Sequence, residues 1–361
     1  MSKTSHKSAL NQSESTAASS NINSDSAGKI KAFRKNRLTD QEIIDQLLAG
    51  NKTALSRAIT LIESNQANHQ KRAEKLVEAC LPYAHKSIRI GITGVPGVGK
   101  STFIEAFGSF LVKNGKKVAV LAVDPSSTIS RGSILGDKTR MENLVTEENA
   151  FIRPSPSGVT FGGVARKTRE SIILCEAAGF DIILIETVGV GQSETTVHSM
   201  TDFFLLLKLA GAGDELQGIK RGIIEMADSI VINKADGKNL KPAKMASLEF
   251  NRALHLYPPK PSDWQPKVLL CSAVEQTGIS EIWEMIEKYQ IAVKKNNFFS
   301  KNRREQNKFW LLQTIDEHLK TRFYQDPKIQ KELQEQLTAI ENNETTPFIA
   351  AAHLLELSKS L

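Results

Sequence analysis

Residues 94–101 read Gly-Val-Pro-Gly-Val-Gly-Lys-Ser, and they stand between an apolar run, 88–93, and a helix-like segment, 103–111. This is the pattern G-x4-G-K-[S/T] in the order strand, glycine-rich loop, helix. The glycines let successive backbone N–H groups turn inward around a phosphate, while Lys100 can neutralise β- and γ-phosphate oxygens and Ser101 can ligate Mg²⁺. We therefore expect a nucleotide-binding loop made of Gly94, Val95, Pro96, Gly97, Val98, Gly99, Lys100, Ser101 and Thr102.

Short runs that are apolar on both faces recur along the central part of the chain, separated by segments of helix length. They cover 88–93, 118–124, 180–187, 203–210, 229–233 and 268–272. Strands without a polar face belong in a mostly parallel sheet that helices cover on both sides. The sequence therefore predicts an α/β fold of the P-loop NTPase type, with a mostly parallel sheet flanked by helices.

Helical patterns precede and follow this sheet. Thr39 and Glu42 form a capping-box pair before a first helix that ends near residue 50, and two further helices are expected over 53–63 and 66–81. From Ile279 the pattern is helical to the end, and Pro327 and the pair Thr346-Pro347 are expected to start the last helices. We expect this part to pack on the central domain or on another copy of itself. The domains expected are a tail that does not fold (1–38), a helical preface (39–86), a nucleotide-binding domain (87–290) and a C-terminal helical arm (291–361).

A second motif, Asn233-Lys234-Ala235-Asp236, directly follows an apolar run and addresses the base of the nucleotide. The Asp236 carboxylate can accept the N1–H and the exocyclic N2–H of guanine, whereas adenine has no such donor pair. Asn233 can brace the loop, and the Lys234 stem can lie along the base. Ser272 and Ala273, at the end of the last apolar run, fit a loop whose backbone N–H contacts guanine O6. GTP and GDP are therefore expected rather than ATP.

Mg²⁺ and the γ-phosphate need oxygen ligands and donors at the tips of neighbouring strands. Ser101, Asp124, Asp137 and Glu186 are the expected metal ligands, although a helix cap is the alternative role for Asp137. Gly189 can bring its N–H to the γ-phosphate.

Hydrolysis is expected to be slow, because Val190 stands where Ras-like GTPases have the glutamine that orients the attacking water. A partner, or a rearrangement of the segment 211–221, would then accelerate it. The expected catalytic residues are Lys100, Glu186 and Lys220, and a solvated lysine is the alternative for Lys220.

Composition excludes several other classes of protein. The 47 Lys and Arg exceed the 40 Asp and Glu by +7, but residues 1–40 hold +4 of this excess. The basic run 294–308 is interpreted as a solvated face or a linker, so we expect no nucleic-acid partner. No run approaches about 18 apolar residues, which excludes a membrane helix. Three separated cysteines favour a reducing compartment. A transit peptide at the N-terminus stays an alternative, although acidic residues are unusual in one.

Taken together, these strings resemble the methylmalonyl-CoA mutase-associated GTPases of the SIMIBI class, that is, the MeaB and methylmalonic aciduria type A family. The similarity runs from about Asn51 to the C-terminus. Outside the general GTPase motifs it includes the stretches 57–63, 124–127, 132–141, 186–194, 278–283 and 303–306, and also Trp310.

The resemblance implies properties that spacing alone does not. Asp124, Asp137 and Glu186 would lie near Mg²⁺, Gln217 and Lys220 would belong to a third switch segment, and the C-terminal helices would form a homodimer arm. The family's role is to gate adenosylcobalamin loading of methylmalonyl-CoA mutase, a cobalamin-dependent acyl-CoA mutase, and to protect and reactivate that enzyme. A cytoplasmic location is implied, or the mitochondrial matrix in a eukaryote.

Other classes of GTPase and nucleotidase are weighed against this interpretation. A nickel metallochaperone of the same class would need clustered His or Cys ligands, and the seven His are scattered. A signal-recognition GTPase would need a Met-rich tail, and the whole chain has six Met. A transport-associated nucleotidase or kinase, the label on some older relatives, fits poorly with a guanine motif.

Overall fold

The computed structural model describes residues 38–123, 141–154, 161–187, 193–211 and 221–359. In these ranges a parallel seven-stranded sheet has the order β3-β2-β4-β1-β5-β6-β7. Its strands are β1 (Ile88–Thr93), β2 (Val118–Val123), β3 (Ala150–Arg153), β4 (Ile182–Thr187), β5 (Phe203–Leu209), β6 (Ser229–Asn233) and β7 (Lys267–Leu270). The predicted α/β class with a mostly parallel sheet is confirmed.

The central strand β1 pairs with β4 on one side and β5 on the other. Strands β2 to β4 lie on one side of β1 and strands β5 to β7 lie on the other, so the connections change direction at β1. Ligands of open α/β sheets bind at the carboxyl ends of strands at such a switch. The sequence-based expectation lacks β3. It is a four-residue edge strand followed by Pro154, too short to show a run of its own.

Helices cover both faces of the sheet. They are α2 (Asp40–Leu48), α3 (Lys52–Glu63), α4 (Ala67–Cys80), α5 (Lys100–Lys113), α7 (Phe161–Ala177), α8 (Ser193–His198), α10 (Arg221–Met226), α11 (Leu240–Leu254), α12 (Ile279–Lys295), α13 (Phe298–Gln325), α14 (Pro327–Glu341) and α15 (Pro347–Lys359). Side chains of α5 and α12 form one core with the sheet, and those of α2–α4, α7 and α8 form another. None of these helices is long and apolar enough to cross a membrane.

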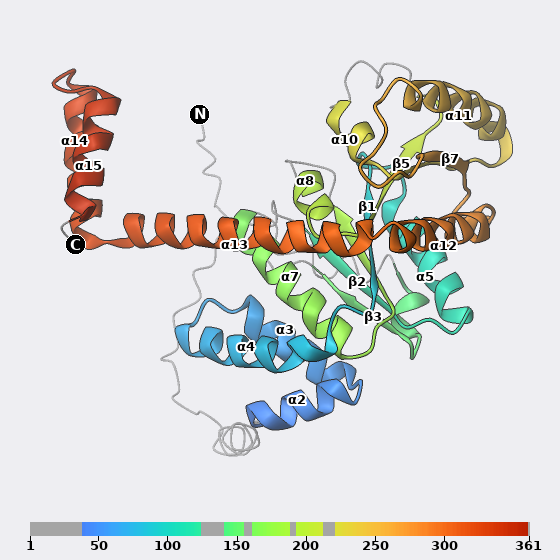
Figure 1. Ribbon diagram of the computed structural model, residues 1–361, viewed down its shortest axis with the longest axis horizontal. Helices are drawn as coiled ribbons and strands as arrows, with labels where there is room; N and C mark the ends of the chain where they lie inside the picture. Colours follow the sequence, from blue (N-terminus) through green and yellow to red (C-terminus); the bar gives the residue numbers. More distant parts are fainter. Residues whose placement is uncertain (1–37, 124–140, 155–160, 188–192, 212–220, 360–361) are drawn as a thin grey trace, which may run out of the picture.

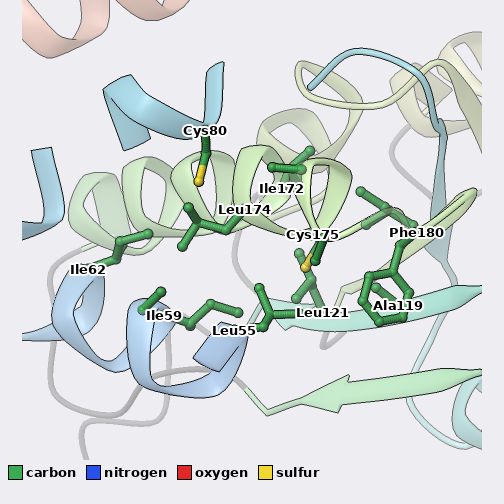
Figure 2. Packing of buried hydrophobic residues seen from close by; sticks show 14 of the residues in the cluster. Leu55, Ile59, Ile62, Cys80, Ala119, Leu121, Ile172, Leu174, Cys175 and Phe180 are labelled. Carbon is green, nitrogen blue, oxygen red and sulfur yellow. The ribbon is translucent and has the colours of Figure 1, made fainter. Parts of the chain in front are cut away.

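The helical preface shares a core with the sheet. Thr39 caps α2 in the predicted capping box, and α3 and α4 follow close to the expected ranges. Leu55 and Ile59 of α3 are buried together with Leu121 of β2 and Cys175 of α7 (Figure 2). Because each large apolar side chain contributes about 1.5–3 kcal/mol on burial, the preface is held by ordinary core packing.

The C-terminal part begins on the sheet and ends far from it. Helix α13 crosses the nucleotide-binding domain and carries α14 and α15 at its distal end (Figure 1). Pro327 and Pro347 start the last two helices, as expected. The predicted division into domains stays a prediction, and its boundary at 290/291 falls inside α12.

The interpretation of 294–308 as a solvated face is wrong for Arg303. This side chain is buried and forms an ion pair with Asp202, with Nη2 and Oδ2 2.7 Å apart. The spacing of charges alone does not distinguish one buried arginine from exposed neighbours, because the partner lies about a hundred residues away in the chain.

Candidate nucleotide-binding site

The glycine-rich loop 94–99 joins the carboxyl end of β1 to the start of α5, as predicted. Gly94 has φ +153° and Gly99 has φ +92°. A Cβ on Gly94 would lie 2.7 Å from the Leu207 carbonyl oxygen, and a Cβ on Gly99 would lie 2.8 Å from Asn233 Nδ2. Both positions therefore require glycine, for backbone conformation and for space. The loop is at the switch point of the sheet, where an anion meets a helix N-terminus.

Lys100 is the first residue of α5 and is only 8% exposed. Its Nζ donates to the Gly94 carbonyl oxygen at 2.8 Å and to that of Val95 at 3.4 Å. Burial lowers the pKa of Lys100, and the charges of Glu186 and Glu194 oppose this. Among the described residues no carboxylate forms an ion pair with Lys100. A phosphate in the loop would supply the anionic partner that this buried cation needs.

Ser101 and Glu186 lie together, as the sequence predicts. Ser101 Oγ donates to Glu186 Oε1 at 3.2 Å, and both residues lie near the carboxyl ends of β1 and β4. Thr187 Oγ1 donates to Thr93 Oγ1 at 2.9 Å, which ties the tip of β4 to β1. A hydroxyl beside a carboxylate is the kind of donor set that Mg²⁺ prefers. In the described ranges no group of three or more His, Cys, Asp and Glu could hold a metal.

The guanine motif contacts the glycine-rich loop. Asn233, at the end of β6, donates from Nδ2 to the Val98 carbonyl oxygen at 2.9 Å. Lys234 adopts φ +57°, and its Nζ donates to the Gly97 carbonyl oxygen at 2.9 Å. The buried Asn233 Oδ1 has no hydrogen-bond partner among the described residues. The two motifs thus form one connected site, in which a buried acceptor is available to a ligand.

The second half of the base site comes from the loop after β7. Ser272 Oγ donates to Asp236 Oδ2, and the Glu275 N–H donates to Ser272 Oγ at 3.1 Å. The Ala235 N–H donates to the Cys271 carbonyl oxygen at 3.0 Å. These bonds bring 233–236 and 272–273 together, and they fix the direction of the Asp236 carboxylate.

Several expected site residues lie outside the described residues: Asp124, Asp137, Gly189, Val190, Gln217 and Lys220. Their roles stay predictions. Sequence reasoning gave no role to Thr93, Thr187 and Glu194, which support the site. Both threonines directly adjoin predicted site residues, so their position at the strand tips is the signal that could have identified them.

Comparison with known proteins agrees with this geometry. The profile of the family described as "Methylmalonyl Co-A mutase-associated GTPase MeaB" matches residues 55–328. The chain belongs to this family. A probable GTPase of Mycobacterium tuberculosis is 48% identical over 323 residues, which are 88% of this chain and 96% of the relative. The mouse "Methylmalonic aciduria type A homolog, mitochondrial" is 42% identical, and the match covers 89% of this chain and 81% of the mouse protein.

A solved structure has the same fold as this chain. The crystal structure of an LAO/AO transport system kinase is 40% identical, with a TM-score of 0.72, and the match covers 90% of this chain and 99% of that chain. The resemblance inferred from the motifs is confirmed, and so is the P-loop fold. This MeaB-family chain is therefore a GTPase that binds GTP and GDP and hydrolyses GTP.

Proposed function

We propose that this GTPase is a chaperone for a cobalamin-dependent acyl-CoA mutase, methylmalonyl-CoA mutase. It would gate the loading of adenosylcobalamin, and it would protect and reactivate the mutase. The observation that carries the proposal is the match of residues 55–328 to a family described as associated with that mutase. The name of the mouse relative refers to methylmalonic aciduria and to mitochondria, which supports a mutase client and, in a eukaryote, a location in the mitochondrial matrix. In a bacterium the location would be the cytoplasm.

The nucleotide site supplies the chemistry for the proposal. Phosphate oxygens would accept backbone N–H bonds from 94–101, and Lys100 would exchange its bonds to the Gly94 and Val95 carbonyl oxygens for bonds to the β- and γ-phosphates. Asp236, oriented by Ser272, would accept the two N–H groups of guanine. The same carboxylate would face unmatched groups on adenine, so GTP would bind more tightly than ATP.

Ser101 and Glu186 are the described residues that would hold Mg²⁺, and Asp124 and Asp137 are proposed to complete the ligand set. The bound ion would neutralise charge shared by the β- and γ-phosphates. The Gly189 N–H is the proposed donor to the γ-phosphate, and Lys220 is proposed to bring a further positive charge. Without a water-positioning glutamine at position 190, basal hydrolysis would be slow and open to stimulation by the client.

The test of the client uses the full chain as bait in an extract of its native host. With a non-hydrolysable GTP analogue bound, the acyl-CoA mutase should co-purify, and the purified mutase should raise GTP turnover. Lys100→Ala is the matched control. It removes the side chain that would bind the phosphates, and it leaves the surface outside the nucleotide site unchanged. Failure of the mutase both to co-purify and to change the turnover would refute the proposed client.

The C-terminal arm is proposed to form a homodimer. Its helices α13 and α15 expose large apolar side chains, namely Leu311, Leu312, Ile315, Leu319, Phe348, Ile349 and Leu355. An exposed apolar surface of this kind marks a protein interface, and a self-complementary one gives a two-fold dimer. The dimer would present two nucleotide sites on one pair of arms.

Analytical ultracentrifugation tests whether the arm forms a dimer. The wild type should sediment as two copies, and the double variant Leu312→Glu/Leu319→Glu should sediment as one, because the charges would be buried on association. Leu256→Glu is the control, since Leu256 is 87% exposed but lies on the loop after α11. A dimeric double variant, or a monomeric wild type, would contradict this role of the arm.

A transport-associated nucleotidase is the second candidate function, and the description of the solved relative as a transport system kinase favours it. A kinase would transfer the γ-phosphate to a protein. Incubation with γ-labelled GTP and host extract separates the two functions: labelled phosphate appears free in solution for a GTPase chaperone and on a transport protein for a kinase.

A further inference from the structure

The four residues Ser199–Asp202 connect α8 to β5, and we refer to them as the α8–β5 junction. Helix α8 begins at Ser193, shortly after the predicted γ-phosphate contact at Gly189. Glu194 in its first turn is buried and acts electrostatically on Lys100. The junction is therefore one short helix away from the nucleotide.

Side chains of α12 and α13 contact most of this junction. Trp310 Nε1 donates to the Ser199 carbonyl oxygen at 3.1 Å, and Gln306 Nε2 donates to that of Thr201 at 2.7 Å. At Asp202, Arg303 donates to both carboxylate oxygens, at 2.8 and 2.7 Å, and Tyr289 Oη donates to the carbonyl oxygen at 2.8 Å. Residues 303, 306 and 310 share one face of α13.

Arg169 of α7 joins the same contact from the other side. Its Nη2 donates to Ser199 Oγ at 3.0 Å, and its guanidinium carbon lies 4.5 Å from the centre of the Trp310 ring. Burial lowers the pKa of Arg169 to about 10, against the opposing charge of Glu317. A stacked arginine and an indole N–H bond thus hold Ser199 between α7 and α13.

Two features of the structure allow this junction a second arrangement. Arg169 Nε and Gln306 Oε1 are buried and have no hydrogen-bond partner among the described residues, so the present arrangement leaves polar groups unsatisfied. On its other side the junction borders a cleft of about 850 Å³, lined in part by Thr201, Asp202, Lys301 and Glu305. Space is therefore available for a shift of α8 and of the first half of α13.

We propose that the α8–β5 junction transmits the nucleotide state to the C-terminal arm, through the contacts of Arg169, Gln306 and Trp310. A displacement of α8 moves the Ser199 and Thr201 carbonyl groups, and α13 follows because its own side chains are bonded to them. The proposal rests on GTP and GDP binding, and it is independent of the proposed mutase client.

The fluorescence of Trp310 can report this movement. The chain has three Trp, so the variant Trp264→Phe/Trp283→Phe keeps Trp310 as the remaining one. Its fluorescence is measured with GDP and with a non-hydrolysable GTP analogue, each with Mg²⁺ and at concentrations shown by titration to saturate. The emission maximum and the quenching by iodide should shift between the two states. Identical emission and identical quenching in both states would overturn the proposal.

Thermodynamic linkage gives a second test that a purely structural role would not satisfy. Trp310→Phe removes the indole N–H bond, and the ratio of the Kd values for GDP and the GTP analogue should change by about fivefold or more. Trp283→Phe is the matched control, because it is the same substitution on α12 at a ring that lies against Phe107 of α5, with 6.3 Å between the ring centres. An unchanged ratio in Trp310→Phe would refute the coupling, and so would an equal change in the control.

Discussion

Replacing Arg303 with methionine removes the ionic anchor of the C-terminal arm. Arg303 is 8% exposed and donates to both Asp202 carboxylate oxygens, to the Ser87 carbonyl oxygen at 2.8 Å and to the His85 carbonyl oxygen at 3.1 Å. Methionine keeps much of the volume of the side chain and supplies no donor. The variant therefore leaves Asp202 with a buried charge and without its cationic partner.

The size of the loss in free energy of unfolding depends on the partners that Asp202 keeps in the variant. Removal of one partner of a buried ion pair costs about 3–5 kcal/mol. The Arg89 N–H still donates to Asp202 Oδ2 at 2.8 Å, while Glu176 keeps its ion pair with Arg89, so part of the network survives. We expect Arg303→Met to lower the free energy of unfolding by about 4 kcal/mol, roughly a thousandfold in the unfolding equilibrium.

Urea denaturation followed by circular dichroism measures this loss. Arg304→Met is the matched control, since Arg304 is the exposed neighbour on the same helix, and it should change the free energy of unfolding by no more than about 0.5 kcal/mol. A loss in Arg303→Met below about 1 kcal/mol would refute the reasoning, because the ion pair would then be worth no more than the apolar contacts that replace it.

Three further predictions concern the site and the buried network. Lys100→Ala should weaken GTP binding by about 1.5–3 kcal/mol in a titration without lowering the melting temperature, because within the described ranges its Nζ bonds to carbonyl oxygens of the loop alone. Undiminished hydrolysis would contradict the loop's role. Asp236→Asn should lose a similar amount of affinity for guanine nucleotides and should favour xanthosine triphosphate, because O2 of xanthine accepts the new amide donor. If GTP competes with xanthosine triphosphate equally well in the variant and in the wild type, Asp236 has no part in base recognition. Burial raises the pKa of Glu176, but Arg89 and the hydrogen bonds of Ser87 and His85 outweigh it and hold that pKa below the ordinary 4.5. Ionised Glu176 therefore stabilises the fold fully above pH 4.5, and this contribution is lost as the pH falls and the carboxylate takes up a proton. The difference in free energy of unfolding between the wild type and Glu176→Gln should shrink below pH 4.5, and a difference that stays constant in urea titrations would contradict the prediction.

Much of the candidate site could be predicted because its chemistry is local. In 94–101 and 233–236 the functional groups lie within a few residues of one another, so their spacing in the chain is nearly their spacing in space. Helix starts were equally readable at Thr39, whose side chain accepts from the Glu42 N–H, and at Pro327. The edge strand β3 was not predicted, because four residues carry too little pattern.

By itself the sequence determined the parallel sheet, the phosphate loop, the guanine motif and the helical ends, since these depend on backbone geometry and on apolar periodicity within short segments. Only the tertiary structure decided how the arm is attached. Arg303 and Asp202 are separated by 101 residues, and Trp310 and Ser199 by 111. These charges and donors contribute to stability only in the folded state, where water is removed from around them. A buried polar group without a partner costs free energy, and only the fold decides which distant residue lies close enough to be that partner.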